Sequence, residues 1–487
     1  MKTYIKGNTM KVSIRTVVLA CLLVSLSALS AFAQEKVYEN APKIGPETTS
    51  AMHTAEFWIS QLPTDPDKVI LTPEQISAKN NDTVNIPEKL KTAVDINGDP
   101  YDINKTIGYN DKTGAQYAVI DPLEMLSFPG DSLRARLATH RKHVNSRDFY
   151  DHRDMIYDED KKNEWFAMTD VDAIPDVITP RYGIVTAHSS CRVIPTNQAG
   201  LGKKGQWWVE GFQSASVDLA IPVTILHETK DKDWYYVRTE VAFGWIPAKD
   251  VAIGSKKEIA KYAASKDFIV SLANKVPVYG DKKYGHYMLD LYMGATLKLV
   301  KKTSDGYRVK APFRKSDGNL TLVNGYINSD ANVSIGFQPF TQRNMYTTLF
   351  ELLYTPYHWN DANNGRNCCG YIRSVLRTFG IKTGSWPSFQ MHYANKPFVF
   401  PADTPREKKH ELLRRCAPGV CLVGGNGHVN AYLGEVDGFH YLIHMGGYDW
   451  YEGDNKVMMY RRVNVNYSEL PGNYNIDSWT KISPLVP

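Results

Sequence analysis

The apolar positions in the middle of the chain come in short runs with the pattern of β-strands. Runs of β-branched and aromatic residues such as 223–226 are separated by turn signals, and one series closes with Gly244-Trp245-Ile246. The same order of apolar strand, turn, aromatic strand and glycine–aromatic–isoleucine returns and closes with Gly325-Tyr326-Ile327. Short, closely spaced strands are typical of small all-β domains, and the repeated order indicates two in tandem. We therefore predict one barrel over residues 166–255 and a second over residues 256–335.

The spacing of an amphipathic helix follows within residues 366–381. Apolar residues recur there at i, i+3, i+4 and i+7, namely Ile372, Val375, Leu376 and Phe379. Asn367 is a favoured N-cap residue, and Gly380 is placed to end the helix. Cys368 therefore falls in the first turn, where the positive end of the helix dipole favours a thiolate. Taken alone, Cys368 is equally compatible with a small buried apolar residue.

The first 33 residues have the pattern of a secretory signal. A basic start precedes an apolar run at 17–32, and Ala31-Phe32-Ala33 matches a cleavage site. The run is short for a membrane anchor, and no other segment is apolar enough to span a bilayer. We therefore expect an exported mature chain, periplasmic or associated with the cell envelope, with no transmembrane segment.

Residues 34–165 are polar and irregular, with helix-start signals such as Thr72-Pro73. The segment lacks a dense apolar pattern, so we predict a clip that packs over the other domains. Residues 336–487 then form the last domain, which contains the helix with Cys368.

Composition narrows the function only a little. The chain has 487 residues, 43% hydrophobic and 22% charged, as in ordinary globular proteins, and its net charge of +5 gives no indication of nucleic-acid binding. Five cysteines remain after the signal, too few for a disulfide scaffold, and the odd count leaves at least one free thiol. The sequence is compatible both with a Cys416–Cys421 disulfide and with two reduced thiols.

Two histidines lie where a cysteine nucleophile would need them. Residues 427–434 and 441–444 read as two strands of a hairpin, and they carry His428 and His444. A cysteine nucleophile needs a base, and the base needs an orienting group, so these residues can supply both roles. Each histidine alone is more often an ordinary core or surface residue. A zinc site with Cys368 and Cys369 is disfavoured because adjacent cysteines lack the usual ligand spacing, so no metal or cofactor is expected.

The motifs of the last domain together resemble those of NlpC-type papain-like cell-wall cysteine peptidases. That family reads P-Y-x-W, D-C-S, G-H-x-x-x-Y-x-G and I-H in this order. The matching positions here are Pro356-Tyr357-x-Trp359, Asn367-Cys368-Cys369, Gly427-His428 with Tyr432 and Gly434, and Ile443-His444. The two glycine–aromatic–isoleucine elements are similar to the Gly-Trp-Val element of bacterial SH3-like domains. The whole mature chain resembles family members with an N-terminal clip and two SH3-like domains.

The resemblance implies an α+β fold, with a papain-like peptidase domain preceded by two small all-β SH3-like barrels and the clip. It implies that Cys368 is the nucleophile, His428 the general base and acid, and His444 the residue that orients His428. Tyr357 would help form the oxyanion hole. The implied reaction is hydrolysis of the D-γ-glutamyl–diaminopimelate (or lysine) bond of peptidoglycan stem peptides with a free N-terminal L-Ala, by a monomer. The alternatives are a catalytically decayed wall-binding protein and an acyl transferase that uses the same thioester chemistry.

The resemblance also suggests residues for substrate binding, with some departures from the family. The expected set is Asn367, Cys369, Trp359, Glu210, Phe243 and Ser388. Asn367 replaces an aspartate, Cys369 replaces a serine, and Asn360-Asp361 replaces a pair of glycines. Because Asn367 cannot pair with an ammonium as a carboxylate does, we predict that Glu210, from the barrel covering the L-Ala end, holds the free amine. The alternative for Glu210 is a solvated loop charge.

Overall fold

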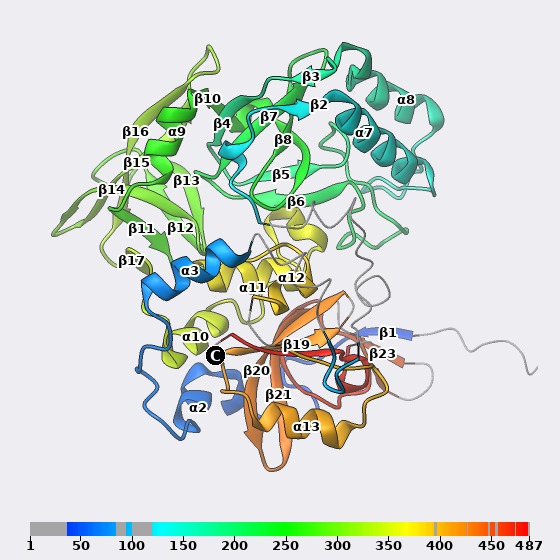
Figure 1. The fold of residues 1–487 in the computed structure, drawn as a ribbon, viewed down its shortest axis with the longest axis vertical. Coiled ribbons are helices and arrows are strands. Elements are labelled where there is room, and N and C mark those ends of the chain that lie inside the picture. The colour runs from blue at the N-terminus through cyan, green and yellow to red at the C-terminus, as the bar shows by residue number, and fades with distance from the viewer. Residues whose placement is uncertain are drawn as a thin grey trace, which may run out of the picture.

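The computed structural model describes residues 37–83, 94–99, 119–393, 397–425, 427–446, 449–452, 456–472 and 474–485. The predicted signal sequence lies outside these residues. In Figure 1 two β-sheets form the upper part of the molecule, and a third sheet with its helices forms the lower part. Within the described residues, no helix is both long and apolar enough to cross a membrane.

The first sheet is built from residues 181–254, inside the region predicted as the first barrel. Its seven strands pair antiparallel in the order β10-β4-β7-β8-β9-β5-β6. The strands are β4 (Arg181–Val185), β5 (Ser189–Arg192), β6 (Gln213–Val217), β7 (Pro222–Glu228), β8 (Trp234–Arg238), β9 (Phe243–Pro247) and β10 (Val251–Gly254).

The second sheet follows with the same number of strands, in the order β13-β12-β16-β15-β14-β11-β17. They are β11 (Phe268–Ser271), β12 (Lys275–Tyr279), β13 (Tyr287–Tyr292), β14 (Thr296–Thr303), β15 (Gly306–Arg314), β16 (Leu320–Asn328) and β17 (Val333–Ile335). Helix α9 (Lys256–Ala263) joins the two sheets, and a capping box between Ser255 and Glu258 begins it. Two separate sheets fit the predicted tandem arrangement, while an SH3-like fold for the second stays a prediction.

The last domain combines a six-stranded sheet with helices. The strand order is β18-β25-β19-β20-β21-β24. Its strands are β18 (Phe398–Val399), β19 (Cys421–Gly425), β20 (His428–Val436), β21 (Phe439–Gly446), β24 (Arg462–Tyr467) and β25 (Lys481–Pro484). Its helices are α10 (Gln342–Glu351), α11 (Cys368–Arg377), α12 (Pro387–Met391) and α13 (Arg406–Arg414), with 3-10 turns η5 (Trp359–Asn364) and η6 (Ile476–Ser478). In Figure 1, α11 and α12 lie between the upper sheets and this sheet.

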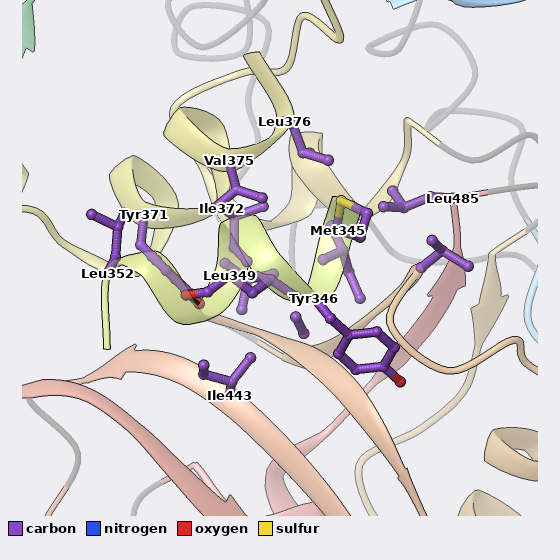
Figure 2. Packing of buried hydrophobic residues seen from close by; sticks show 14 of the residues in the cluster. Met345, Tyr346, Leu349, Leu352, Tyr371, Ile372, Val375, Leu376, Ile443 and Leu485 are labelled. Carbon is purple, nitrogen blue, oxygen red and sulfur yellow. Dashed lines mark hydrogen bonds between the residues drawn. The ribbon is translucent and has the colours of Figure 1, made fainter. Parts of the chain in front are cut away.

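Helix α11 forms where its apolar spacing predicts it. The side chain of Asn367 accepts a hydrogen bond from the backbone N–H of Gly370 at 2.8 Å, and Gly380 has a φ of 77° just beyond the helix. Figure 2 shows Ile372 of α11 packed with Leu349 of α10 and Ile443 of β21. Burying such a side chain contributes about 1.5–3 kcal/mol, so this face fixes the helix on the sheet.

The N-terminal residues pack against both parts of the molecule, and their role as a clip stays a prediction. Helix α2 (Ala55–Ser60) packs on α10, and β1 (Val37–Asn40) pairs in parallel with β23 (Lys456–Met459), which pairs with β22 (Asp449–Glu452). The other N-terminal helices are α3 (Pro73–Thr83), α7 (Gly130–Asn145) and α8 (Glu159–Met168). Figure 1 shows α7 and α8 beside the first sheet. The short strands β2 (Phe128–Pro129) and β3 (Val177–Ile178) pair antiparallel as a separate small sheet. The remaining 3-10 turns are η1 (Ala51–His53), η2 (Pro122–Glu124), η3 (Val171–Ala173) and η4 (Ala248–Asp250).

Candidate active site

The Cys368 thiol opens helix α11 and lies against the start of strand β20. Its Sγ is 3.9 Å from the carbonyl oxygen of Gly427 and 3.9 Å from the Sγ of Cys369. A hydrogen bond from the Cys369 thiol, the charge of His428 and a hydrogen bond with His428 hold the pKa of Cys368 well below its usual value. Burial and the neighbouring Cys368 sulfur instead raise the pKa of Cys369. The opposite pKa shifts favour a thiolate at Cys368 over one at Cys369.

The two histidines meet because a hairpin brings their strands together. Ala431 of β20 pairs with Ile443 of β21, so His428 and His444 lie close on adjacent strands. His428 Nε2 lies 3.1 Å from His444 Nδ1, and both side chains are buried. Burial, and then the charge of His428, lowers the pKa of His444 well below its usual value. His444 is therefore a neutral group that can orient His428.

Tyr474 and Asn466 complete the surroundings of the histidines, and no sequence motif pointed to either. The Tyr474 ring stacks on His428 with centroids 4.4 Å apart and an angle of 18° between the planes. Asn466 Nδ2 lies 2.8 Å from His444 Nε2. A cavity of about 140 Å³ borders His428 on this side. Asn466 lies on the strand after the hairpin, and only the pairing of β21 with β24 brings it to His444.

Tyr357 lies close to Cys368, as its predicted role requires. It is buried, and its backbone N–H donates to the carbonyl oxygen of Arg461 at 2.8 Å. Burial, and then the charge of Cys368, raises the pKa of its phenol far above the usual value. The Tyr357 hydroxyl therefore keeps its proton and can act as a hydrogen-bond donor near Cys368.

The residues beside the nucleophile have structural contacts of their own. Asn367 caps α11, so its side-chain oxygen is already engaged, and Cys369 is buried against Cys368. Trp359 is 39% exposed, and its backbone N–H donates to the carbonyl oxygen of Trp208 at 2.9 Å. Among these predicted binding residues, Trp359 offers the most open surface, at the point where a loop of the first sheet meets η5.

Glu210 lies inside the first sheet and is not a solvated loop charge. It is 2% exposed, and its carboxylate pairs with Arg192. The same carboxylate accepts from the backbone N–H of Gly200 at 2.6 Å and of Phe212 at 3.0 Å. The alternative of a solvated loop charge is therefore wrong, while the predicted amine contact stays a prediction. A substrate ammonium could reach Glu210 only by breaking this internal pairing, so the structure does not favour that contact.

Phe243 and Ser388 are not brought to the nucleophile by any described contact. The Phe243 ring packs against Phe128 and under the guanidinium groups of Arg136 and Arg238, in the cluster between the first sheet and α7. Strand β9 turns this side chain toward the clip, which sequence alternation alone could not decide. Ser388 belongs to α12, and its side chain lies outside the described residues.

Asp361, one of the departures from the family pattern, supports the start of α11. Its Oδ1 accepts from the backbone N–H of Asn367 at 2.8 Å, and its Oδ2 lies 3.3 Å from Arg373 and 3.4 Å from the hydroxyl of Ser216. An aspartate is therefore absent at position 367 but present at 361, where it faces the helix and the first sheet. The loss of an aspartate at 367 together with the gain of one at 361 was the sequence signal that could have revealed this support of the helix start.

The described cysteines and ligand-type residues indicate neither disulfides nor a metal site. Cys416 and Cys421 are both free and buried, so of the two alternatives the structure has reduced thiols. Within the described ranges, no group of three or more histidine, cysteine, aspartate or glutamate side chains is arranged to hold a metal ion.

Comparison with known proteins places this geometry in a recognised fold. A family model for an SH3 domain of the SH3b1 type matches residues 210–247, which cover β6 to β9. An NlpC/P60 endopeptidase from Photobacterium damselae subsp. piscicida is similar over 92% of this chain and 99% of its own, with a TM-score of 0.70 at 16% identity. An NlpC/P60 family protein from Bacillus cereus ATCC 10987 matches 63% of this chain and 100% of its own, but its TM-score of 0.45 at 15% identity carries no argument. No curated protein matches the chain in sequence. The chain therefore has the α+β fold of an NlpC/P60 endopeptidase over nearly its whole length, with an SH3 domain of the SH3b1 type within it.

Proposed function

We propose that this chain is an exported cysteine endopeptidase that hydrolyses the D-γ-glutamyl–diaminopimelate (or lysine) bond of peptidoglycan stem peptides. It acts as a monomer and prefers stems with a free N-terminal L-Ala. The observation that carries the proposal is the arrangement of Cys368 against His428, with His444 on the far nitrogen of His428. This is the nucleophile, base and orienting group of a thiol hydrolase.

The chemistry follows from these groups. The Cys368 thiolate attacks the carbonyl carbon of the γ-glutamyl bond, and the backbone N–H of Cys368, left unpaired at the helix start, faces the developing oxyanion. The Tyr357 hydroxyl is the second donor. The carbon–nitrogen bond then breaks, and His428 gives its proton to the leaving amine. Water attacks the thioester with His428 as base, and the acid leaves as Cys368 regains its thiolate.

The loop at residues 198–213 supports the preference for short, free stems. It reaches from the first sheet to η5, where Trp208 accepts the hydrogen bond from Trp359 and lies under the guanidinium of Arg461 at 3.2 Å. We infer from these contacts that the loop closes one end of the region around Cys368. The preference for a free amine therefore rests on this closure, and it does not rest on Glu210.

The test is incubation with L-Ala-γ-D-Glu-diaminopimelate and mass analysis of the products. We expect L-Ala-γ-D-Glu and free diaminopimelate, none of either with Cys368→Ala, and slower cleavage of the N-acetylated peptide. Equal rates on the free and acetylated peptides would refute the closed end while leaving the peptidase standing. Binding of peptidoglycan without any cleavage would indicate the wall-binding alternative. Transfer of the dipeptide to an added amine in preference to water would indicate the acyl transferase.

A further inference from the structure

A row of buried amide side chains continues from the histidines onto the next strand. Asn464 and Asn466 of β24 are both buried, and Asn464 pairs in register with His444. Asn466 Nδ2 lies 2.8 Å from His444 Nε2, and Asn464 Nδ2 lies 3.1 Å from Asn466 Oδ1. Buried amides are costly unless their hydrogen bonds are made, so this row needs a reason beyond packing.

The direction of the first bond in the row decides where His444 holds its proton. If the Asn466 NH₂ donates to Nε2, neutral His444 has its proton on Nδ1 and donates it to His428 Nε2. His428 Nε2 must then accept through its lone pair. The proton of neutral His428 therefore sits on Nδ1, the nitrogen that would interact with Cys368. In that state His428 cannot accept the thiol proton. An imidazolium would place two N–H groups against each other across 3.1 Å.

The opposite direction makes the site competent. The two ends of an amide have the same shape, so a half-turn of Asn466 places its oxygen against His444 Nε2. His444 then carries its proton on Nε2, and its Nδ1 accepts from His428 Nε2–H. His428 Nδ1 is then unprotonated, and its lone pair can accept the proton of Cys368.

Asn464 can follow the same turn. In the described part of the chain, the Oδ1 of Asn464 is buried without a hydrogen-bond partner. When Asn464 turns with Asn466, this oxygen accepts from the turned Asn466 NH₂. The cost is the 3.2 Å bond from Asn464 to the carbonyl oxygen of Val465, and the Asn464 NH₂ takes the buried place that its oxygen left. The row then runs in one direction from Cys368 to Asn464.

We propose that Asn466 is a positioning residue whose side-chain oxygen accepts the Nε2 proton of His444 and so fixes His444 as the acceptor for His428. The inference deepens the proposed function, because it rests on Cys368 and His428 as nucleophile and base. Among the described contacts, Cys368 of α11 and the stacked Tyr474 act on His428, while Cys369 and Tyr357 lie beside Cys368.

Nitrogen-15 NMR of histidine-labelled protein tests the inference without substrate. The His444 signals are assigned by their loss in His444→Gln. We expect the proton of His444 on Nε2 at neutral pH, and a proton on Nδ1 would overturn the proposal. Because this readout needs no turnover, a protein that cleaves no stem peptide could still show the proposed tautomer, so the two proposals fail separately.

Two variants of Asn466 test the direction of the bond by function. Asn466→Asp can accept but, when ionised, cannot donate, whereas Asn466→Leu has a similar size and can do neither. We expect Asn466→Asp to keep hydrolysis and the iodoacetamide labelling of Cys368 near parent rates. Asn466→Leu should lose roughly 100-fold in kcat, the scale of a lost general base, with little change in KM. Peptide mapping separates labelling of Cys368 from that of Cys369, and circular dichroism confirms folding.

Two results with these variants would also overturn the proposal. One is an Asn466→Asp variant as inactive as Asn466→Leu while both remain folded, since that would show that position 466 must donate. The other is an Asn466→Leu variant with the parent pH profile, since that would show a role in packing alone.

Discussion

Asp218 connects the first sheet to the far end of the catalytic helix, and its removal should destabilise that junction. It follows β6 and is buried, and its carboxylate accepts from His188 Nδ1 at 2.8 Å and pairs with Arg377 in the last turn of α11. Burial alone would raise the pKa of Asp218, but the charge of Arg377 and the hydrogen bond from His188 bring it far below the usual value. Asp218→Asn keeps the shape and removes the charge.

The size of the effect follows from what the substitution leaves behind. The Arg377 side chain is only 15% exposed, so without Asp218 a buried guanidinium loses its paired carboxylate, while the charge of Glu240 still acts on it. Breaking a buried pair by removing one partner costs about 3–5 kcal/mol. For the two domains that this ion pair joins, a loss of about 3–5 kcal/mol corresponds to a fall in Tm of roughly 10 °C. Because the folded pKa lies below the unfolded one, this stabilisation is fully present above about pH 4 and is lost only as the pH falls further.

Differential scanning calorimetry at neutral pH measures the effect. Glu228→Gln is the matched control, because Glu228 pairs with Arg181 across the same sheet at 2.7 Å but both side chains are partly exposed, so the change should stay below about 1 kcal/mol. The double variant Asp218→Leu with Arg377→Met removes both charges and should recover most of the loss. A parent-like Tm for Asp218→Asn would refute the reasoning. So would a double variant less stable than Asp218→Asn alone.

Three further predictions concern the nucleophile and the buried glutamate. Cys368→Ala should abolish hydrolysis in a folded protein, whereas Cys369→Ala should leave it active, and the reverse result would show that the wrong cysteine was assigned. The rate of hydrolysis should rise at a pH well below the range in which an ordinary cysteine ionises, because the Cys369 hydrogen bond and His428 stabilise the Cys368 thiolate. On this acidic side of the pH–rate profile, Cys369→Ala should lower the rate roughly tenfold, and Cys369→Ser should restore it. Glu210→Gln weakens the buried pair with Arg192 and should lower the Tm by several degrees while the ratio of rates on free and acetylated peptide stays unchanged; a lost preference for the free peptide would restore Glu210 as the amine contact.

The parts of the site that were predictable are those encoded by neighbours in the sequence. The amphipathic spacing and the capping Asn367 are local, so α11 and the place of Cys368 in its first turn could be read directly. The hairpin needs only one turn to bring His428 and His444 together, and strand spacing sufficed to find it. Local patterns therefore predicted the helix that begins at Cys368 and the hairpin that brings the two histidines together.

The parts that were missed depend on partners distant in the sequence. Glu210 looks like any loop glutamate until the fold brings Arg192 and the backbone of Gly200 around it. Asn466 carries no motif, and its value comes from the pairing of β24 with β21. Phe243 alternates correctly in its strand, but the side of the sheet that meets α7 is set by tertiary packing. The surroundings of each of these side chains are set by contacts between residues far apart in the sequence, which no local pattern encodes.

The first sheet and the residue that follows β6 contact α11 at both of its ends. At the start of α11, Asn360 donates to the carbonyl oxygen of Gln213 at 2.8 Å, and Asp361 joins the hydroxyl of Ser216 to the backbone N–H before Cys368. At the other end, the charge of Arg377 is met by Asp218 of the same sheet. A wall-binding module joined by a linker would not need buried charges shared with the catalytic helix. A shift of this sheet would instead move the N–H groups and the thiolate that the proposed chemistry uses, so the arrangement favours one catalytic unit.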